Sequence, residues 1–186
     1  MTLERHLQDM GNEDKFLRHS GMLQLSGVST EELTAFRAVW LSLSKARKKE
    51  ILTKLTELGE DNLELDFSAI FRSCLKDDSD EVRVRATRGL WDCDDRVIIR
   101  PLVELLREDP SEKVRAAAAA SLAKFAEMAQ EGKLLDRDGA RIQEALLSVI
   151  RKEDEDLGAR RRAIEAVASF NSREIEQIIL DAFHSG

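Results

Sequence analysis

Histidine and cysteine supply much of the chemistry in protein sites, and neither is arranged for it in this 186-residue chain. The histidines, His6, His19 and His184, lie near the two ends and share no metal-ligand spacing. We expect all three to be solvated. Cys74 and Cys93 are the only cysteines and belong to no CxxC or Cys/His cluster. This pattern favours two free thiols in a reducing compartment over a metal site or a disulfide.

Other catalytic motifs are also missing from the sequence. The glycines are isolated and form no phosphate-binding loop, and no GxSxG turn presents a nucleophilic serine. Carboxylates are abundant, but they cluster where helices are expected to begin, and helix capping explains them there. We therefore predict no catalytic residue, no metal site, no cofactor and no enzymatic activity.

Composition narrows the choice of partner. Charged residues make up 35% of the chain and the formal net charge is −7, so no overall positive field attracts nucleic acid. No apolar run has the roughly 18–20 residues of a membrane span. The first ten residues carry acidic side chains where a signal peptide is apolar. We expect a cytoplasmic protein without a membrane partner.

The elements that must position any site are all predicted to be helices. No segment shows the two-residue alternation or the β-branched runs of strands. Ser29 and Glu32 form a capping-box pattern at the start of the first clear helix. Helical spacing of apolar residues then predicts helices over about 29–43, 45–58 (ending at Gly59), 66–75 (capped by Asp66), 80–91, 95–107, 111–129, 138–152, 156–169 and 172–183.

One short pattern occurs three times in these helices. Each copy follows an acidic turn and begins with valine or alanine directly before an arginine. A small residue stands four positions after that first residue, and an aliphatic residue stands eight positions after it. The copies are Val82-Arg83 with Ala86 and Leu90, Val114-Arg115 with Ala118 and Leu122, and Ala159-Arg160 with Ala163 and Val167. The arginines are 32 and 45 residues apart. Self-similarity at this period is typical of stacked repeat proteins.

The pattern resembles HEAT repeats, and it is closest to the short bacterial type. The copy at 109–118 is nearly the family consensus, whereas the copy at 154–167 has Ala159 in place of valine. The resemblance covers 66–186 well and 29–65 in outline. It implies an all-α solenoid, a HEAT-like superhelix of antiparallel hairpins at about 29–65, 66–108, 109–153 and 154–186. Residues 1–28 are expected to be a lead-in segment of short helices or irregular chain.

The resemblance also implies roles for the repeated charged residues. Arg83, Arg115 and Arg160 are expected to form an inter-repeat ladder with acidic residues near helix starts, and Asp80, Asp109 and Asp156 are the candidates. These six residues are interpreted as structural. Truncation of one of the arginines should destabilise the stack.

Function is expected on the surface formed by the second helices of the hairpins, which would line a concave face. Outward positions on these helices are Arg96, Arg100, Glu104, Arg141, Glu144, Arg173 and Gln177. We predict a non-enzymatic scaffold or interaction module that binds a protein or peptide of mixed charge. Trp40 and Trp91 are expected to fill the core; an exposed tryptophan would instead serve as an anchor for a partner.

Three alternatives remain open from the sequence. A phycobilin-lyase-like or other enzyme-accessory HEAT protein would need a pigment-sized pocket. A nucleic-acid binder could use Arg160-Arg161-Arg162, although the net charge opposes it. The chain could also associate with itself through its carboxyl end, where no polar capping repeat follows Phe183. Such an uncapped end would fit the amino-terminal part of a longer array.

Overall fold

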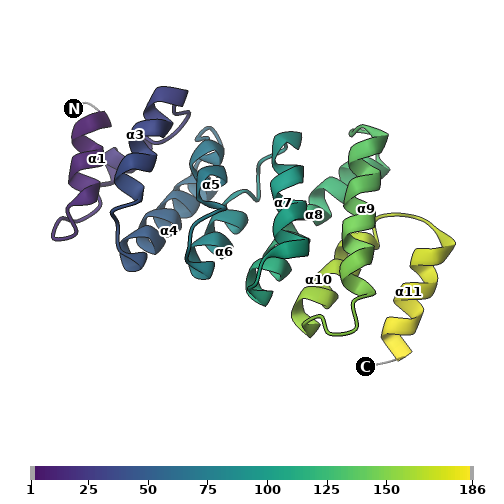
Figure 1. Cartoon of the computed structure of the whole chain (residues 1–186). Helices are drawn as coiled ribbons and strands as arrows, with labels where there is room; N and C mark the ends of the chain where they lie inside the picture. Colours follow the sequence, from purple (N-terminus) through teal and green to yellow (C-terminus); the bar gives the residue numbers. More distant parts are fainter. Residues whose placement is uncertain (1–2, 185–186) are drawn as a thin grey trace. The chain divides into compact units, whose positions relative to one another are not determined.

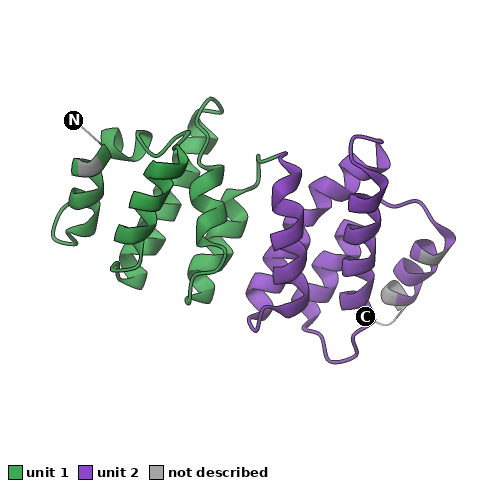
Figure 2. Ribbon diagram, turned by 45° about the horizontal axis from the view of Figure 1, so that its top comes forward, with its two compact units in different colours: residues 1–93 green, residues 94–186 purple. Residues whose placement is uncertain are grey.

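The computed structural model describes residues 3–184, and these residues are helical apart from the connections between helices (Figure 1). No strand occurs in this described range, so the all-α prediction is confirmed there. The chain divides into two compact units, residues 1–93 and 94–186 (Figure 2). The division lies inside the hairpin predicted at 66–108.

The first unit has two layers of helices. Along each layer, successive helices pack side by side, and α5 packs against α6 between the layers. One layer contains α1 (Leu3–Gly11), α3 (Thr30–Trp40) and α5 (Ser68–Cys74); the other contains α2 (His19–Leu23), α4 (Lys45–Asp61) and α6 (Asp80–Gly89). The space between them is filled by fully buried apolar side chains, among them Phe36, Ile51, Leu55 and Ile70.

The second unit repeats this arrangement with longer helices. A 3₁₀ turn, η1 (Arg96–Ile98), leads into α7 (Ile99–Glu108), which packs beside α9 (Asp136–Ile150). In the other layer α8 (Glu112–Gln130) packs closely against α10 (Leu157–Val167). The chain then enters α11 (Arg173–His184), on which Ile175 is buried.

The repeated apolar positions lie in the core of both units. In each copy of the repeated pattern, the residue before the arginine is fully buried, as is the small residue four positions after that residue: Val82, Val114, Ala159, Ala86, Ala118 and Ala163. Alanine at these positions lets neighbouring helices approach, because it adds no side chain beyond Cβ. Within each unit the helices therefore stack as predicted for an α-solenoid.

Local capping fixes where several helices begin. The Ser29 hydroxyl accepts a hydrogen bond from Glu32 N at 3.2 Å, and Glu32 Oε2 accepts one from Ser29 N at 2.8 Å, which confirms the predicted capping box. The predicted end at Gly59 is wrong, because α4 continues to Asp61. A glycine can lie inside a helix at a modest cost when apolar neighbours such as Leu55 and Leu58 hold the turn in the core.

The amino-terminal segment is an integral part of the first unit. Arg47 of α4 is buried and donates to the carbonyl oxygens of Met10 (3.2 Å), Asn12 (3.2 Å) and Lys15 (2.7 Å), which ties the α1–α2 connection to α4. The expected short helices are present as α1 and α2.

Two expectations about single side chains are wrong. His6 is only 6% exposed, because α1 packs into the unit and Gly21 leaves room for its ring; a Cβ at Gly21 would lie 2.7 Å from His6 Nδ1. His19 is exposed as expected, and the side chain of His184 lies outside the described residues. Trp40 is buried, but Trp91 is 46% exposed because it follows the end of α6.

Gly89 offers a test of the packing between α5 and α6. A Cβ added there would overlap the ring of Phe71, so Gly89→Ala should lower the free energy of unfolding by about 1–3 kcal/mol. Gly59→Ala is the matched control. Its Cβ would lie 3.9 Å from Phe67 Cδ2, in ordinary contact, and we expect a gain of about 0.5–1 kcal/mol from better helix propensity. Urea denaturation followed by tryptophan fluorescence measures both, and equal effects would contradict the assigned packing.

Candidate functional site

A lysine or arginine occupies the same place at the start of four helices, α4 and α6 in the first unit and α8 and α10 in the second. It lies four residues after the N-cap residue of α4, α6, α8 and α10, whose N-caps are Ser44, Ser79, Ser111 and Asp156. We call these four side chains, Lys48, Arg83, Arg115 and Arg160, the turn cations. Three are the arginines predicted to form a ladder. The sequence pattern did not predict a role for Lys48, because the first hairpin contains no Val-Arg pair.

The turn cations of α6, α8 and α10 return to the chain that enters their own helix. Arg83 Nη1 donates to the carbonyl oxygens of Asp77 (2.8 Å) and Asp78 (3.2 Å). Arg115 Nη1 donates to those of Asp109 (2.8 Å) and Pro110 (3.3 Å). Arg160 Nη2 reaches the carbonyl oxygens of Lys152 (2.7 Å) and Glu153 (3.0 Å). The guanidinium groups thus donate to carbonyl oxygens of the turns that precede the three helices.

Carboxylates of the same turns accept hydrogen bonds from backbone N–H groups at the helix starts. Asp77 Oδ1 accepts a hydrogen bond from Ser79 N at 3.0 Å, and Asp109 Oδ1 accepts one from Ser111 N at 2.9 Å. At the third copy Asp156 takes the N-cap position and accepts from Gly158 N (2.7 Å) and Ala159 N (3.1 Å). Asp80, one of the three predicted acids, accepts a hydrogen bond from Glu81 N at 2.8 Å.

In the first unit, the charge ladder connects α4 to the turn before α6. Lys48 Nζ lies 2.7 Å from Asp77 Oδ2, and Trp40 Nε1 donates to the same oxygen at 2.8 Å. Lys48 also lies over the Trp40 ring, 5.5 Å from its centroid, and Trp40 stacks on Phe36. Burial opposes ionisation of Asp77, but the hydrogen bonds from Lys48, Ser79 N and Trp40 outweigh it and keep its pKa below the ordinary value.

In the second unit, the ladder connects α8 to the turn before α10. Arg115 Nε and Nη2 both donate to Glu155 Oε1, at 2.8 Å and 2.6 Å. The side chains are 13% and 1% exposed, so the pair is shielded from water. The acids that bind Lys48 and Arg115 are therefore Asp77 and Glu155. Asp77 could have been predicted as a pairing acid from the sequence, because it has the same place in the first copy of the pattern as Asp109 has in the second, 32 residues further on.

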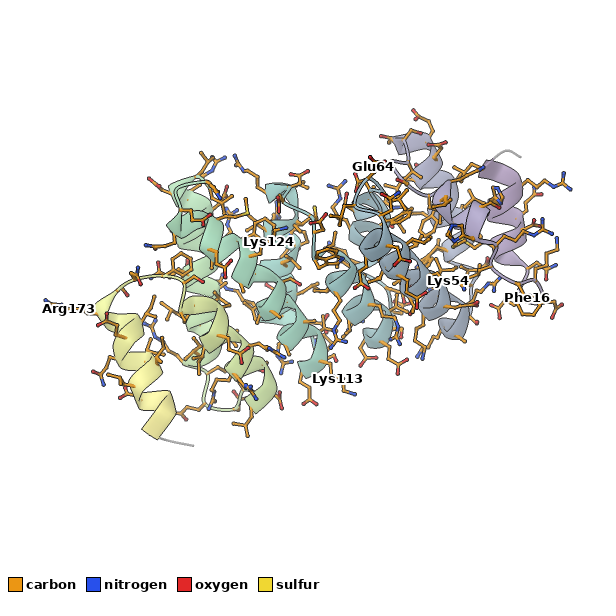
Figure 3. All side chains as sticks on the ribbon, turned by 180° about the vertical axis from the view of Figure 1, so that it is seen from behind. Phe16, Lys54, Glu64, Lys113, Lys124 and Arg173 are labelled. Carbon is orange, nitrogen blue, oxygen red and sulfur yellow. The ribbon has the colours of Figure 1, made fainter. Side chains whose placement is uncertain are left out.

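The residues predicted to contact a partner lie mostly on two adjacent helices of the second unit. Arg96 belongs to η1, Arg100 and Glu104 to α7, and Arg141 and Glu144 to α9. We call these five residues the α7–α9 face. Arg173 (labelled in Figure 3) and Gln177 lie apart from them on α11, where Gln177 Nε2 donates to Asp181 Oδ1 at 2.8 Å.

Ion pairs connect the α7–α9 face across the two helices. The buried carboxylate of Asp138 lies 3.0 Å from Arg96 Nη2 and 3.8 Å from Arg141 Nη1. Glu144 lies 3.4 Å from Arg107, and Arg100 Nε donates to Glu104 at 2.9 Å. The Arg100 and Glu144 side chains are 80% and 78% exposed. The face therefore presents both signs of charge to solvent.

The described residues contain neither a candidate metal site nor a candidate membrane-spanning helix. Among residues 3–184, no group of three or more His, Cys, Asp or Glu side chains could hold a metal ion. No helix in the part of the chain that the structure describes is long and apolar enough to cross a membrane. Cys74 is buried, and burial raises the pKa of its thiol to about 12, so it stays protonated at neutral pH.

The Lys48–Asp77 contact predicts a pH dependence of stability. Because the folded-state pKa of Asp77 is depressed, its stabilisation is complete above the unfolded value of about 3.9 and is lost as pH falls through the folded pKa. Asp77→Asn should cost about 2 kcal/mol at pH 7, the scale of a hydrogen bond to a charged group. The difference in urea midpoint between the wild type and the variant should keep its full size from pH 7 to about pH 4 and shrink as the pH falls further. A constant difference would contradict this assignment.

The Arg115–Glu155 pair predicts strong coupling between α8 and the α10 turn. Glu155→Gln should lower the free energy of unfolding by about 3 kcal/mol, because it leaves Arg115 shielded and without a full counter-charge. Arg115→Met should cost a similar amount, and the double variant should cost clearly less than the sum. Both tryptophans lie in the first unit, so the cycle is measured by far-UV circular dichroism. Additive effects would show that the two side chains act independently.

Comparison with known families agrees with this geometry. Residues 68–138, from α5 to the start of α9, match the family described as HEAT repeats. No curated protein matches the chain. The matched stretch contains two of the turn cations, Arg83 and Arg115, each bonded to the carbonyl oxygens of an acidic turn. Residues 68–138 are thus similar to HEAT repeats, and the helices of each unit stack in two layers, as those of an α-solenoid do.

Proposed function

We propose that this chain is a non-enzymatic interaction module that binds a protein or peptide of mixed charge on its α7–α9 face. HEAT repeats form a helical module that is often used for protein–protein interaction, and this gives the general class of function. The observation that carries the proposal is the exposure of Arg100 and Glu144, four-fifths of whose side chains face solvent on adjacent helices.

The charge arrangement on this face suits recognition. Exposed ion pairs such as Arg100–Glu104 contribute little to stability, so a partner can exchange them at small cost. Arginine is also enriched in protein interfaces, because its guanidinium combines directional hydrogen bonds with a large apolar contact area.

Asp138 holds part of this face in position. Its carboxylate is buried and lies between Arg96 and Arg141, which come from different elements of the chain. Cations fixed in this way lose less conformational freedom on binding than free surface arginines do. The partner expected from this arrangement carries acidic side chains opposite Arg96, Arg100 and Arg141, together with basic groups opposite Glu104 and Glu144.

Charge reversal on the face tests the proposal. The tagged full chain captures partners from the native lysate, and Arg100→Glu/Arg141→Glu is compared with the wild type. We expect the variant to retain its circular dichroism spectrum and lose at least tenfold of the captured partner, since like charges across an interface repel.

The matched control reverses two charges elsewhere on the chain. Lys45→Glu/Lys54→Glu changes the same net charge on α4, in the first unit. It should leave capture unchanged. Equal loss with both variants would indicate a nonspecific charge effect, and a partner indifferent to both would exclude the α7–α9 face.

A further inference from the structure

The two helices of the α7–α9 face run side by side in the same direction (Figure 1). Arg96, directly before α7, contacts Asp138 in the first turn of α9. Arg107, near the end of α7, contacts Glu144 in the second half of α9. Because these contacts occur in the same order on both helices, the helices are parallel, and their charges can be compared along one direction.

Along this direction, each helix presents an arginine before a glutamate. On α7, Glu104 follows Arg100 by one helical turn, and on α9, Glu144 follows Arg141. All four side chains are at least 40% exposed. This part of the face is therefore cationic towards the amino ends of the two helices and acidic about one turn further along.

Helix stability does not account for this order on α7. The amino end of a helix carries a partial positive charge, which makes a cation in the first turn unfavourable. The first turn of α7 nevertheless contains Arg100 and no acidic residue. A glutamate one turn before a cation also stabilises a helix better than the reverse order, and Arg100 with Glu104 has the reverse order. The exposed pair thus departs from two rules of helix stability at once, and binding explains it better.

We propose that the α7–α9 face binds a helix of a partner protein that runs parallel to α7 and α9 and carries acidic side chains one turn before basic ones. The acids lie opposite Arg100 and Arg141, and the bases lie opposite Glu104 and Glu144. This proposal rests on the proposed function and adds the conformation and direction of the partner.

Charge complementarity leads to the parallel direction. Acid before base is the order that stabilises a partner helix by itself. In the parallel direction, the complement of that order is arginine before glutamate, as on α7 and α9. An antiparallel partner would need its bases before its acids, which weakens a helix.

Charge exchanges on one or both helices distinguish a directional site from a face that is merely charged. Arg100→Glu/Glu104→Arg reverses the order on α7 alone, so that α7 and α9 favour opposite partner directions. Adding Arg141→Glu/Glu144→Arg reverses both helices and makes them agree again. Both variants keep the net charge of the chain.

The probe is an alanine-based helical peptide with two glutamates on one face and a lysine four residues after each. It carries a benzophenone cross-linker at its amino end and fluorescein at its carboxyl end. Fluorescence anisotropy at low salt measures its affinity for the full chain. We expect the exchange on α7 alone to weaken binding about fivefold and the exchange on both helices to restore it. Cross-links located by mass spectrometry should lie near the amino ends of α7 and α9 in the wild type, and near their carboxyl ends when both helices are exchanged.

The matched control exchanges an exposed pair of the same spacing on another helix of the second unit. Arg161→Glu/Glu165→Arg on α10 should bind the peptide as the wild type does. Circular dichroism establishes that each variant is folded. The exchange on α7 should not lower the urea midpoint, because it places an acid in the first turn. A lower midpoint would make the charge order a structural feature of α7 and overturn the proposal.

Equal weakening by the two exchanges, cross-links at both ends of the face, or no binding at millimolar peptide would also overturn the proposal. The proposed function would still stand if Arg100→Glu/Arg141→Glu lost the partner captured from the lysate, so the two failures are distinguishable. Self-association of the wild type in sedimentation experiments, abolished by that variant, would assign the face to a second copy of the chain and overturn the choice of partner.

Discussion

Buried helix-entry turns impose the constraint on which both units depend. Stacking places residues such as Ser79, Asp109 and Glu155 out of contact with water, although helix starts carry unpaired backbone groups. A buried carbonyl oxygen without a donor costs free energy comparable to a lost hydrogen bond. An arginine four residues after the N-cap returns to these carbonyls and removes that cost. Its charge is then itself partly buried, and at Arg115 the carboxylate of Glu155 accompanies it.

Within each unit, the position of that carboxylate makes one repeat depend on the next one. Lys48 and Arg115 both bind an acid from the turn that follows them in the stack, Asp77 and Glu155 respectively. The same acids shape their own turns, since Asp77 also accepts a hydrogen bond from Ser79 N. One carboxylate thus connects the entry of its own helix to the preceding helix. Stability in such a protein is largely a sum of nearest-neighbour terms.

The sequence was sufficient where a structural rule acts locally. Helix starts followed from Ser29 with Glu32, and the buried small residues followed from the spacing of Val114, Arg115 and Ala118. Lys48 could not be recognised from residue type, because it shares with the arginines only its distance from the N-cap. Glu155 was missed because Asp156 takes the N-cap role and moves the pairing acid by one residue. The burial of His6 depends on the distant Gly21, which no local pattern reveals.

Exposed and shielded arginines of the second unit serve different purposes. The arginines of the α7–α9 face are exposed and already have acidic neighbours, so a partner there exchanges one screened ion pair for another. Such contacts govern orientation and the rate of association more than affinity. The Arg115 guanidinium is instead shielded and holds Glu155, so its charge serves the packing of α8 against the turn before α10. A partner that bound the α7–α9 face would therefore be steered to it by charge, so that added salt would slow its association more than it would speed its dissociation.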